Sequence, residues 1–531
     1  MTQSAQGTPP APGFVAGSGA ISAYVTPERA AVATFLLVMA IVMAGIVSST
    51  GGQFMYSLDD PYIHLALAER IRMGHYGINL GEVTSPASSI VWPFLLVPFA
   101  GTSAGVYFPL VLNLAFGGLT AFMFGRIADG LTFEGTRDVQ NIVRAVTASL
   151  LVLACNLVGL AFTGMEHNLQ VLVAVAVAWA LIEHSRGTPL PSWAIGLAAL
   201  GPAVRYEMFA ITAAVLLVLL LEKQWKRIAL VGAGSLMLPA AMSLFLHLNG
   251  GSLLPNSVLI KLHQNVGGVT GSTGTSVLTT LGMWLERAVM SHGGGGRILL
   301  LGIAGTLILC WRSADQRQRT LIAAAATTCV LHFAVGQFGW FYRYELYAVA
   351  FCGVIAVVAL AGQVPRAVPY LVAGAAIAYL APLRMTPLGA ANIHEQQYQM
   401  HRFVTEHYRK PFAVHDLGWV SLGLGGKVDV LDLWGLASNE AAREKDKTAA
   451  WLDAVTRRNG TGLAMIFPTA FAQVPASWRK AGALHLAGTR ATTSDATVNF
   501  YATAVGDKAE ITAKLKAFKP SLPPGVVLDI E

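Results

Sequence analysis

Charged residues are scarce in this sequence. Only 12% of the 531 residues are Asp, Glu, Lys or Arg, whereas 54% are hydrophobic and the mean hydropathy is +0.55. A soluble domain carries about 25% charged residues. The composition therefore excludes an ordinary soluble enzyme and predicts a polytopic α-helical membrane protein. We interpret the net charge of +7 as basic anchors in cytoplasmic loops and expect no nucleic-acid partner.

Cysteine is also rare, and several sequence signals are missing. The four cysteines all lie in apolar segments and show no metal-ligand spacing, so we interpret them as small buried hydrophobic residues. The N-terminus lacks a basic segment and a cleavage site, and residues 1–30 are expected to form a disordered tail. No internal repeat stands out, which weighs against a transporter.

Long apolar segments occupy most of the chain up to residue 384. Eleven of them have spanning length. They cover 31–49, 104–125, 144–162, 168–184, 190–205, 208–222, 228–248, 297–311, 320–338, 345–362 and 367–382. A further apolar piece, 87–100, is too short to cross comfortably. We therefore predict a membrane domain over residues 31–384.

The basic residues set the expected orientation. Three loops rich in Arg or Lys lie in the cytoplasm only if residues 87–100 enter the membrane and return to the outer side. This topology places the N-terminus inside, and it places loop 50–103 and the C-terminal part outside. After residue 385, helical patterns fit 394–409 and 436–457, and strand-like runs appear at 412–416, 428–433, 463–468 and 497–505. These elements predict a soluble extracytoplasmic α/β domain over 385–531.

Unusual polar residues gather in the expected outer loops. Because ionisable residues at membrane depth are costly, such residues usually face a cavity and a partner. The set comprises Asp59, Asp60, Glu166, His167, Arg205, Glu207, Asn256, Lys261, Arg343, Tyr344 and Glu345. Simpler interpretations remain open: the two aspartates suit a helix start before Pro61, Arg343 suits an interfacial anchor, and Arg205 and Glu207 could neutralise each other.

The segment after Asp60 is amphipathic. Ile63, Ala66, Leu67 and Ile71 fall on one helical stripe, while the charged residues lie off it. We expect this helix to lie in the outer membrane interface, where it would hold the two acids at the depth of a lipid headgroup.

The ordered motifs resemble a known family. "DDPYIHLALAERIRMGHYGINLGEVTSPAS" (59–88) resembles the first outer loop of GT-C-type glycosyltransferases that use polyprenyl-phosphate sugars. The stretches "TGMEHNLQ", "AVRYEMF", "GSLLPNSVLIK" and "RYELYAVAF" are similar to later motifs of that family, and "FAVHDLGWVSLGLGGKVDVLDLWGLAS" (412–438) is similar to its soluble part. The pattern is most similar to mycobacterial terminal β-(1→2) arabinofuranosyltransferases, which use decaprenyl-phosphoryl-arabinofuranose. Pro61 and Tyr206 stand where the family pattern has Ala and Pro.

The resemblance implies a GT-C-like fold and an inverting glycosyltransferase. In similar families the first acid of the loop motif is the base, so Asp59 would activate the acceptor hydroxyl, and Asp60 would orient it or bind the sugar. A phosphate leaving group needs positive charge, for which Arg205, Lys261 and Arg343 are candidates. Further donor-site candidates are Glu166, His167, Glu207, Asn256 and Tyr344, and candidates for acceptor binding are Trp419 and Trp434.

The expected partners are a polyprenyl-phosphate-linked sugar, an envelope glycan acceptor and the lipid bilayer. No metal site or other cofactor is expected, although a cation that bridges Asp59, Asp60 or Glu166 stays an alternative. We expect a bacterial inner-membrane protein whose site lies on the extracytoplasmic side. Two other functions share these features: a lipid or glycan transporter or flippase, and a non-catalytic protein that binds envelope glycans.

Overall fold

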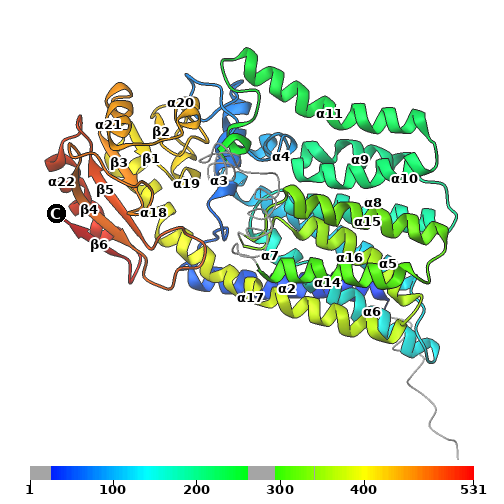
Figure 1. Cartoon of the computed structure of the whole chain (residues 1–531). Helices are drawn as coiled ribbons and strands as arrows, with labels where there is room; N and C mark the ends of the chain where they lie inside the picture. The colour runs from blue at the N-terminus through cyan, green and yellow to red at the C-terminus, as the bar shows by residue number, and fades with distance from the viewer. Residues whose placement is uncertain (1–25, 261–293, 340) are drawn as a thin grey trace, which may run out of the picture.

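The chain forms a bundle of long helices with a sheet-containing domain at one end (Figure 1). A computed structural model describes residues 26–260, 294–339 and 341–531. The first helix, α2, begins at Pro27 with Thr26 as its N-cap, so it starts within the expected tail. The rest of that tail lies outside the described residues.

The bundle helices run side by side and coincide with the eleven expected apolar segments (Figure 1). Their bounds are α2 Pro27–Ser49, α5 Phe108–Asp129, α6 Arg137–Ala154, α7 Leu157–Phe162, α8 His167–Ser185, α9 Ser192–Val204, α10 Phe209–Leu221, α11 Trp225–Leu248, α14 Gly294–Trp311, α15 Gln316–Val335, α16 Leu346–Ala361 and α17 Val368–Glu395. One expected segment is split into α6 and α7, because Asn156 adopts a left-handed conformation with φ 45°. The polytopic helical fold is thus confirmed.

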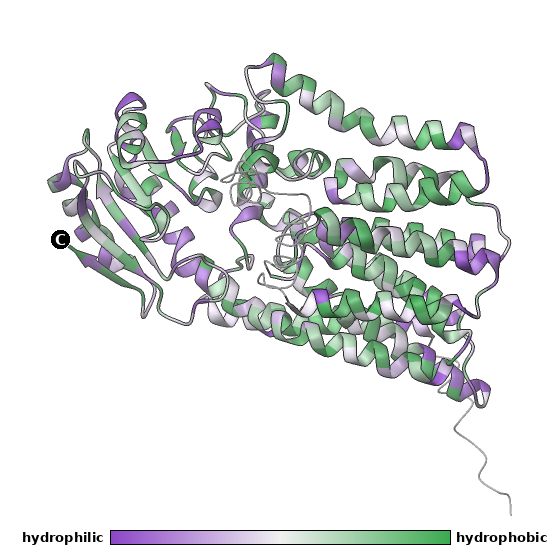
Figure 2. Cartoon of the chain, viewed as in Figure 1, coloured by the Kyte–Doolittle hydropathy of each residue, from purple (hydrophilic) through white to green (hydrophobic). Residues whose placement is uncertain are grey.

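Length and composition agree with membrane crossing. Six of the described helices are long and apolar enough to span a bilayer, and four further apolar helices are shorter. Figure 2 shows that hydrophobic residues dominate the bundle, whereas hydrophilic residues are frequent in the C-terminal domain and in the turns at the far end of the bundle.

Short elements connect α2 to α5 at the end of the bundle near the C-terminal domain. They are α3 (Asp60–Arg72), α4 (Val91–Leu96) and the 3₁₀ turns η1 (Val97–Phe99) and η2 (Gly105–Tyr107). The Ile90 N–H donates to Ala203 O at the end of α9. The Tyr56 hydroxyl, itself in the first loop, donates to Val106 O. The apolar piece 87–100 therefore begins and ends at the same end of the bundle, as expected.

Helix α3 differs from its expected setting. Its residues from Pro61 to Ala68 are all buried, and so is Arg70. The C-terminal domain covers the face that was expected to be solvated, and α3 packs against both α4 and α19 (Gly418–Ser421). The helix is therefore packed between the two parts of the chain rather than exposed on a surface. Its place at the membrane interface stays a prediction.

The C-terminal domain contains a six-stranded sheet of order β2-β1-β3-β5-β4-β6. Strands β1 (Phe412–Val414), β2 (Val430–Asp432) and β3 (Leu463–Ile466) are parallel, whereas β4 (Arg479–His485), β5 (Thr497–Ala502) and β6 (Val527–Ile530) pair antiparallel. The domain also holds α18 (Gln397–Arg402), the π-helix η5 (Phe403–Tyr408), α20 (Asn439–Arg443), α21 (Ala449–Arg458), α22 (Lys508–Phe518) and the turn η6 (Lys519–Ser521). Helix α17 crosses the predicted domain boundary at residue 384 without a break.

Backbone-directed hydrogen bonds fix the domain to the first loop. The Asn79 side chain donates to Val430 O at 2.8 Å and accepts from Val430 N at 3.0 Å, and so it pairs with the edge strand β2 as another strand would. Glu82 accepts from Asn439 N at 2.7 Å, and Glu69 accepts from Gly423 N at 3.0 Å. These contacts hold the two parts at a defined distance, so a site between them is preorganised.

Candidate functional site

A polar cavity of about 530 Å³ lies between the end of the bundle and the C-terminal domain. Residues from both parts line it, including Asp60, His64, Arg205, Ser257, Arg343, Tyr344, His415, Asp416, Trp434, Phe467, Thr469 and Ser494. The wall from the membrane part carries two arginines and one aspartate. The wall from the C-terminal domain carries an aspartate, a histidine and aromatic side chains.

Arg343 forms the centre of the membrane wall. Its Nη2 donates to Asp60 Oδ2 at 2.5 Å and to the Tyr344 hydroxyl at 3.2 Å. Its Nε and Nη1 are buried and find no hydrogen-bond partner in the described part of the chain. The preceding Phe341 and Tyr342 both have positive φ, 61° and 54°, which is a strained conformation for bulky residues. Such strain is typical of functional sites, and here it sets the direction of a buried guanidinium that has unused donors.

Arg205 is also at the cavity, but its charge is already neutralised. Its Nη1 donates to Glu166 at 2.6 Å, and its Nε and Nη2 donate to the two oxygens of Glu207 at 3.1 and 2.9 Å. Burial alone would lower the pKa of Arg205, but Glu207 and Glu166 raise it above its usual range. The interpretation that Arg205 and Glu207 neutralise each other thus fits the geometry, and Arg343 has the more available positive charge.

The adjacent aspartates have different surroundings. Asp60 lines the cavity, and 35% of its side chain is exposed. Asp59 is not among the lining residues: its Oδ1 accepts from Trp419 N at 2.8 Å, and its carboxylate packs so closely on Gly418 that a Cβ there would lie 2.0 Å from Asp59 Cγ. Although Asp59 stands at the N-cap position of α3, it makes no capping hydrogen bond. Burial and the nearby Asp416 carboxylate raise the pKa of Asp59 well above its usual range.

The opposite wall consists of the carboxyl ends of the three parallel strands. His415 and Asp416 directly follow β1, Trp434 follows β2, and Phe467 follows β3. Ligands of open parallel sheets commonly bind at this edge. Of the residues on this wall, only Trp434 was predicted by name as a site residue. The signal that could have found the others was their position just after strands of one parallel sheet.

The polar residues of this wall are held in place. Gln397 Nε2 donates to Asp416 Oδ2 at 2.9 Å, and burial raises the pKa of Asp416 to about 6. Asp432 accepts from Trp434 N at 2.9 Å, which fixes the turn that carries the indole. Burial lowers the pKa of His415 to about 4, so its imidazole is neutral at pH 7, and its ring meets Phe467 edge to face at 4.4 Å.

Other predicted site residues lie near the cavity without lining it. Asn256 donates to Gly435 O at 3.0 Å and so ties the membrane part to the C-terminal domain. His167 is buried at the start of α8 and lies next to the Tyr344 ring. Trp419 stacks on Tyr62 with 4.2 Å between ring centroids. Lys261 lies outside the described residues.

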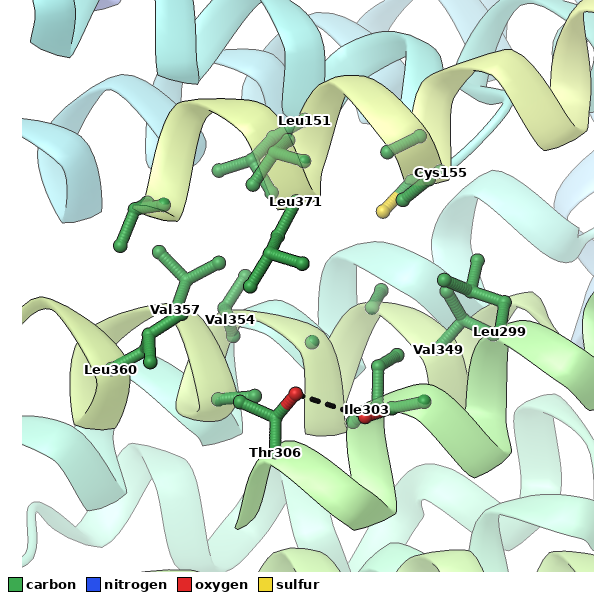
Figure 3. Close-up of a pocket in the computed structure, with 18 residues that line it drawn as sticks. Leu151, Cys155, Leu299, Ile303, Thr306, Val349, Val354, Val357, Leu360 and Leu371 are labelled. Atoms are coloured by element: carbon green, nitrogen blue, oxygen red, sulfur yellow. Dashed lines mark hydrogen bonds between the residues drawn. The ribbon is translucent and has the colours of Figure 1, made fainter. Parts of the chain in front are cut away.

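A second cavity, of about 170 Å³, lies between α6, α14, α16 and α17 (Figure 3), and its lining residue Leu371 is 53% exposed. Its lining is apolar apart from Thr306, whose hydroxyl donates a hydrogen bond to Gly302 O at 2.9 Å. Such a cavity suits hydrocarbon rather than a polar ligand. Within the described ranges, no group of three or more His, Cys, Asp or Glu residues is arranged to hold a metal ion.

Comparisons with known proteins identify the fold. The structure of ArnT from Cupriavidus metallidurans bound to undecaprenyl phosphate matches with a TM-score of 0.50 at 12% identity, over 89% of this chain and 98% of that chain. The Archaeoglobus fulgidus oligosaccharyltransferase in complex with zinc and sulfate matches with a TM-score of 0.45 at 10% identity, over 92% of this chain and 74% of that chain. Residues 391–501 match a family model described as a domain of unknown function (DUF8728). No curated protein matches the chain in sequence. The expected GT-C-like fold is confirmed.

Proposed function

We propose that this protein is a membrane glycosyltransferase that moves a sugar from a polyprenyl-phosphate donor to a glycan acceptor, with inversion at the anomeric carbon. The observation that carries the proposal is the Arg343–Asp60 pair at the polar cavity, where a buried guanidinium with unused donors stands beside a carboxylate. The matching ArnT structure contains undecaprenyl phosphate, which supports a lipid-phosphate donor here.

Arg343 would bind the donor phosphate. Its Nε and Nη1 are buried donors without partners among the described residues, and phosphate oxygens accept charge-assisted hydrogen bonds from such a fork. The guanidinium would also stabilise the charge that grows on the phosphate as the bond to the sugar breaks. Arg205 would not bind the phosphate directly, because Glu166 and Glu207 already neutralise its charge.

Asp60 would be the general base. The sequence-based prediction assigned this role to Asp59, but of the two aspartates only Asp60 lines the cavity. In the transfer step, the acceptor hydroxyl gives its proton to the Asp60 carboxylate while its oxygen bonds to the anomeric carbon. The bond from that carbon to the phosphate oxygen breaks, and the lipid phosphate leaves with the electron pair. Asp59, held by the Trp419 N–H, would orient the start of α3.

The lipid tail needs apolar surface within the bilayer. The apolar cavity between α6, α14, α16 and α17 (Figure 3) is lined by Val349 of α16, the helix that directly follows the Arg343 loop. Tyr342, the neighbour of Arg343, packs edge to face on Tyr379 of α17 with 5.9 Å between ring centroids. We therefore assign this cavity to part of the polyprenyl chain. The proposed donor sugar is arabinofuranose, on the resemblance of the motifs, and the proposed location is the bacterial inner membrane with the cavity on the periplasmic side.

The test is sugar transfer by the purified full-length protein from decaprenyl-phosphoryl-arabinofuranose, with octyl glycosides as acceptors. We expect Asp60→Asn to lower turnover by about 10²-fold or more, the usual scale for loss of a general base, while donor binding persists. Asp59→Asn is the matched control, because it removes the neighbouring carboxylate outside the cavity, and a smaller loss is expected. Near-normal turnover in Asp60→Asn would refute the assignment of the base. Absence of transfer from every polyprenyl-phosphate sugar would refute the function and favour a transporter or a glycan-binding protein.

A further inference from the structure

The cavity has walls of different chemistry. Both described arginines that line it belong to the membrane part, namely Arg205 and Arg343. The lining residues from the C-terminal domain are His415, Asp416, Leu417, Trp434, Leu436, Phe467, Thr469, Ala470 and Ser494. Among these described lining residues there is no Lys or Arg. The donor phosphate therefore has cationic partners on one side of the cavity, and the other side is left for a ligand that needs no positive charge.

The residues of the second wall suit a sugar ring. A carboxylate accepts hydrogen bonds from hydroxyl groups, and Asp416 lies at the cavity with one oxygen already fixed by Gln397. The aromatic faces of Trp434 and Phe467 provide apolar surface beside it. A negatively charged ligand would meet the carboxylates of both Asp416 and Asp60 without a cation from this wall, which is unfavourable in a partly buried site.

We propose that the carboxyl ends of β2, β1 and β3 form the acceptor subsite, and that this subsite takes an uncharged sugar ring. Asp416 accepts hydrogen bonds from the ring hydroxyls, and Trp434 packs against the ring face. This inference rests on the proposed function, since it assigns the acceptor side of the same cavity. It goes beyond that function by naming the binding residues and by excluding acceptors that present a carboxylate or phosphate at the reacting ring.

The subsite is preorganised by contacts away from the ligand. The Asp432 carboxylate accepts from the backbone N–H groups of Trp434 and Ala437, at 2.9 and 2.8 Å, and so holds the turn rigid. The edge-to-face contact of His415 with Phe467 joins the ends of β1 and β3. Because the first loop also pairs with β2 through Asn79, the distance from Asp416 to the membrane wall is fixed before any ligand binds.

The test measures binding separately from transfer. Octyl glucoside and octyl glucuronide form a matched pair of probes that differ by a carboxylate, and their binding to the full-length protein in lipid nanodiscs is measured by saturation-transfer NMR without donor. We expect saturable binding of the neutral probe and at least about tenfold weaker binding of the uronate. Asp416→Asn should weaken binding of the neutral probe by about tenfold, the scale for one lost hydrogen bond to a charged group. Trp434→Ala should also weaken it, because the variant lacks the aromatic ring that packs against the sugar. Trp434→Phe should keep part of the affinity for the neutral probe that Trp434→Ala loses.

Asp429→Asn and Trp451→Ala are the controls. Asp429 is exposed just before β2, at the opposite edge of the sheet, and Trp451 lies on α21 away from the cavity. Unchanged binding in both, with cooperative thermal unfolding that shows every variant to be folded, supports the subsite. Wild-type affinity in Asp416→Asn and Trp434→Ala, equal binding of the two probes, or no saturable binding of the neutral probe overturns the inference. Asp416-dependent binding without any sugar transfer would retain the subsite and refute the proposed function.

Discussion

Replacement of Arg343 by Gln tests how the donor phosphate is held. The change removes the positive charge and the donor fork but keeps a polar side chain. Two buried nitrogens of Arg343, Nε and Nη1, are without partners in the described residues, and we assign both to phosphate oxygens. A hydrogen bond to a charged group contributes about 1.5–3 kcal/mol. Loss of two such bonds is expected to lower kcat/KM for the donor by about 10²–10⁴-fold.

The same change should have little effect on folding. The partner that Arg343 leaves behind, Asp60, is 35% exposed, so water can replace the lost ion pair. The change also removes the cost of burying the guanidinium itself, which is 4% exposed. Arg343→Lys keeps the charge but not the planar fork, and an intermediate loss of kcat/KM is expected. Arg384→Gln is the control, because Arg384 is exposed on α17 and does not line the cavity.

The assay is transfer of labelled sugar from the polyprenyl-phosphate donor by purified variants, with the melting temperature of each as a measure of folding. A donor kcat/KM for Arg343→Gln within threefold of wild type would refute the reasoning. It would mean that the phosphate binds elsewhere, and that the strained loop before Arg343 serves only to anchor the bundle.

Further outcomes follow from the same structure. The pKa of Asp416 is about 6 in the folded protein against an ordinary 3.8, so the folded protein binds this proton more tightly than the unfolded chain. The melting temperature of the wild type should therefore fall as pH rises from about 4 to about 6, and Asp416→Asn should reduce that fall. An identical pH profile in the variant would contradict the assignment. Because the proposed site uses arginine in place of a metal, transfer should persist in EDTA, and activity that returns only with added divalent cation would overturn this expectation. In a background without native cysteines, single cysteines at residues 101–103 should react with an impermeant reagent from the same side as a cysteine in the C-terminal domain, and labelling from opposite sides would mean that residues 87–100 cross the membrane.

The sequence was sufficient for much of the architecture. Helices that cross a bilayer are set by local composition, since about 20 apolar residues in succession have few other stable environments, and the eleven expected segments all coincide with helices. The strands β1, β2, β3 and β5 fall within predicted runs, because they are apolar and rich in Val, Ile and Phe. Strands β4 and β6 were missed: β4 begins with Arg and Lys and contains Gly482, and β6 is a four-residue edge strand.

The sequence predicted some of the residues that line the cavity and missed others. Asp60, Arg205, Arg343 and Tyr344 all line one cavity although up to 284 positions separate them, as the ordered motifs implied. The motifs could not show that Glu166 also binds Arg205, since this contact depends on how α8 and α9 pack. Asp416 and Phe467 were not predicted as site residues, because their position matters only once three strands lie parallel and face the bundle.

Local hydrophobicity and residue type are enough to predict a helical membrane bundle, a C-terminal α/β domain and a set of acids and bases at one end of the bundle. They are not enough to predict that Asp60 and not Asp59 lines the cavity. Successive residues at a helix start point in directions about 100° apart, so two adjacent acids face different neighbours. Which direction meets the cavity depends on the C-terminal domain, whose Trp419 N–H holds Asp59 on the other side.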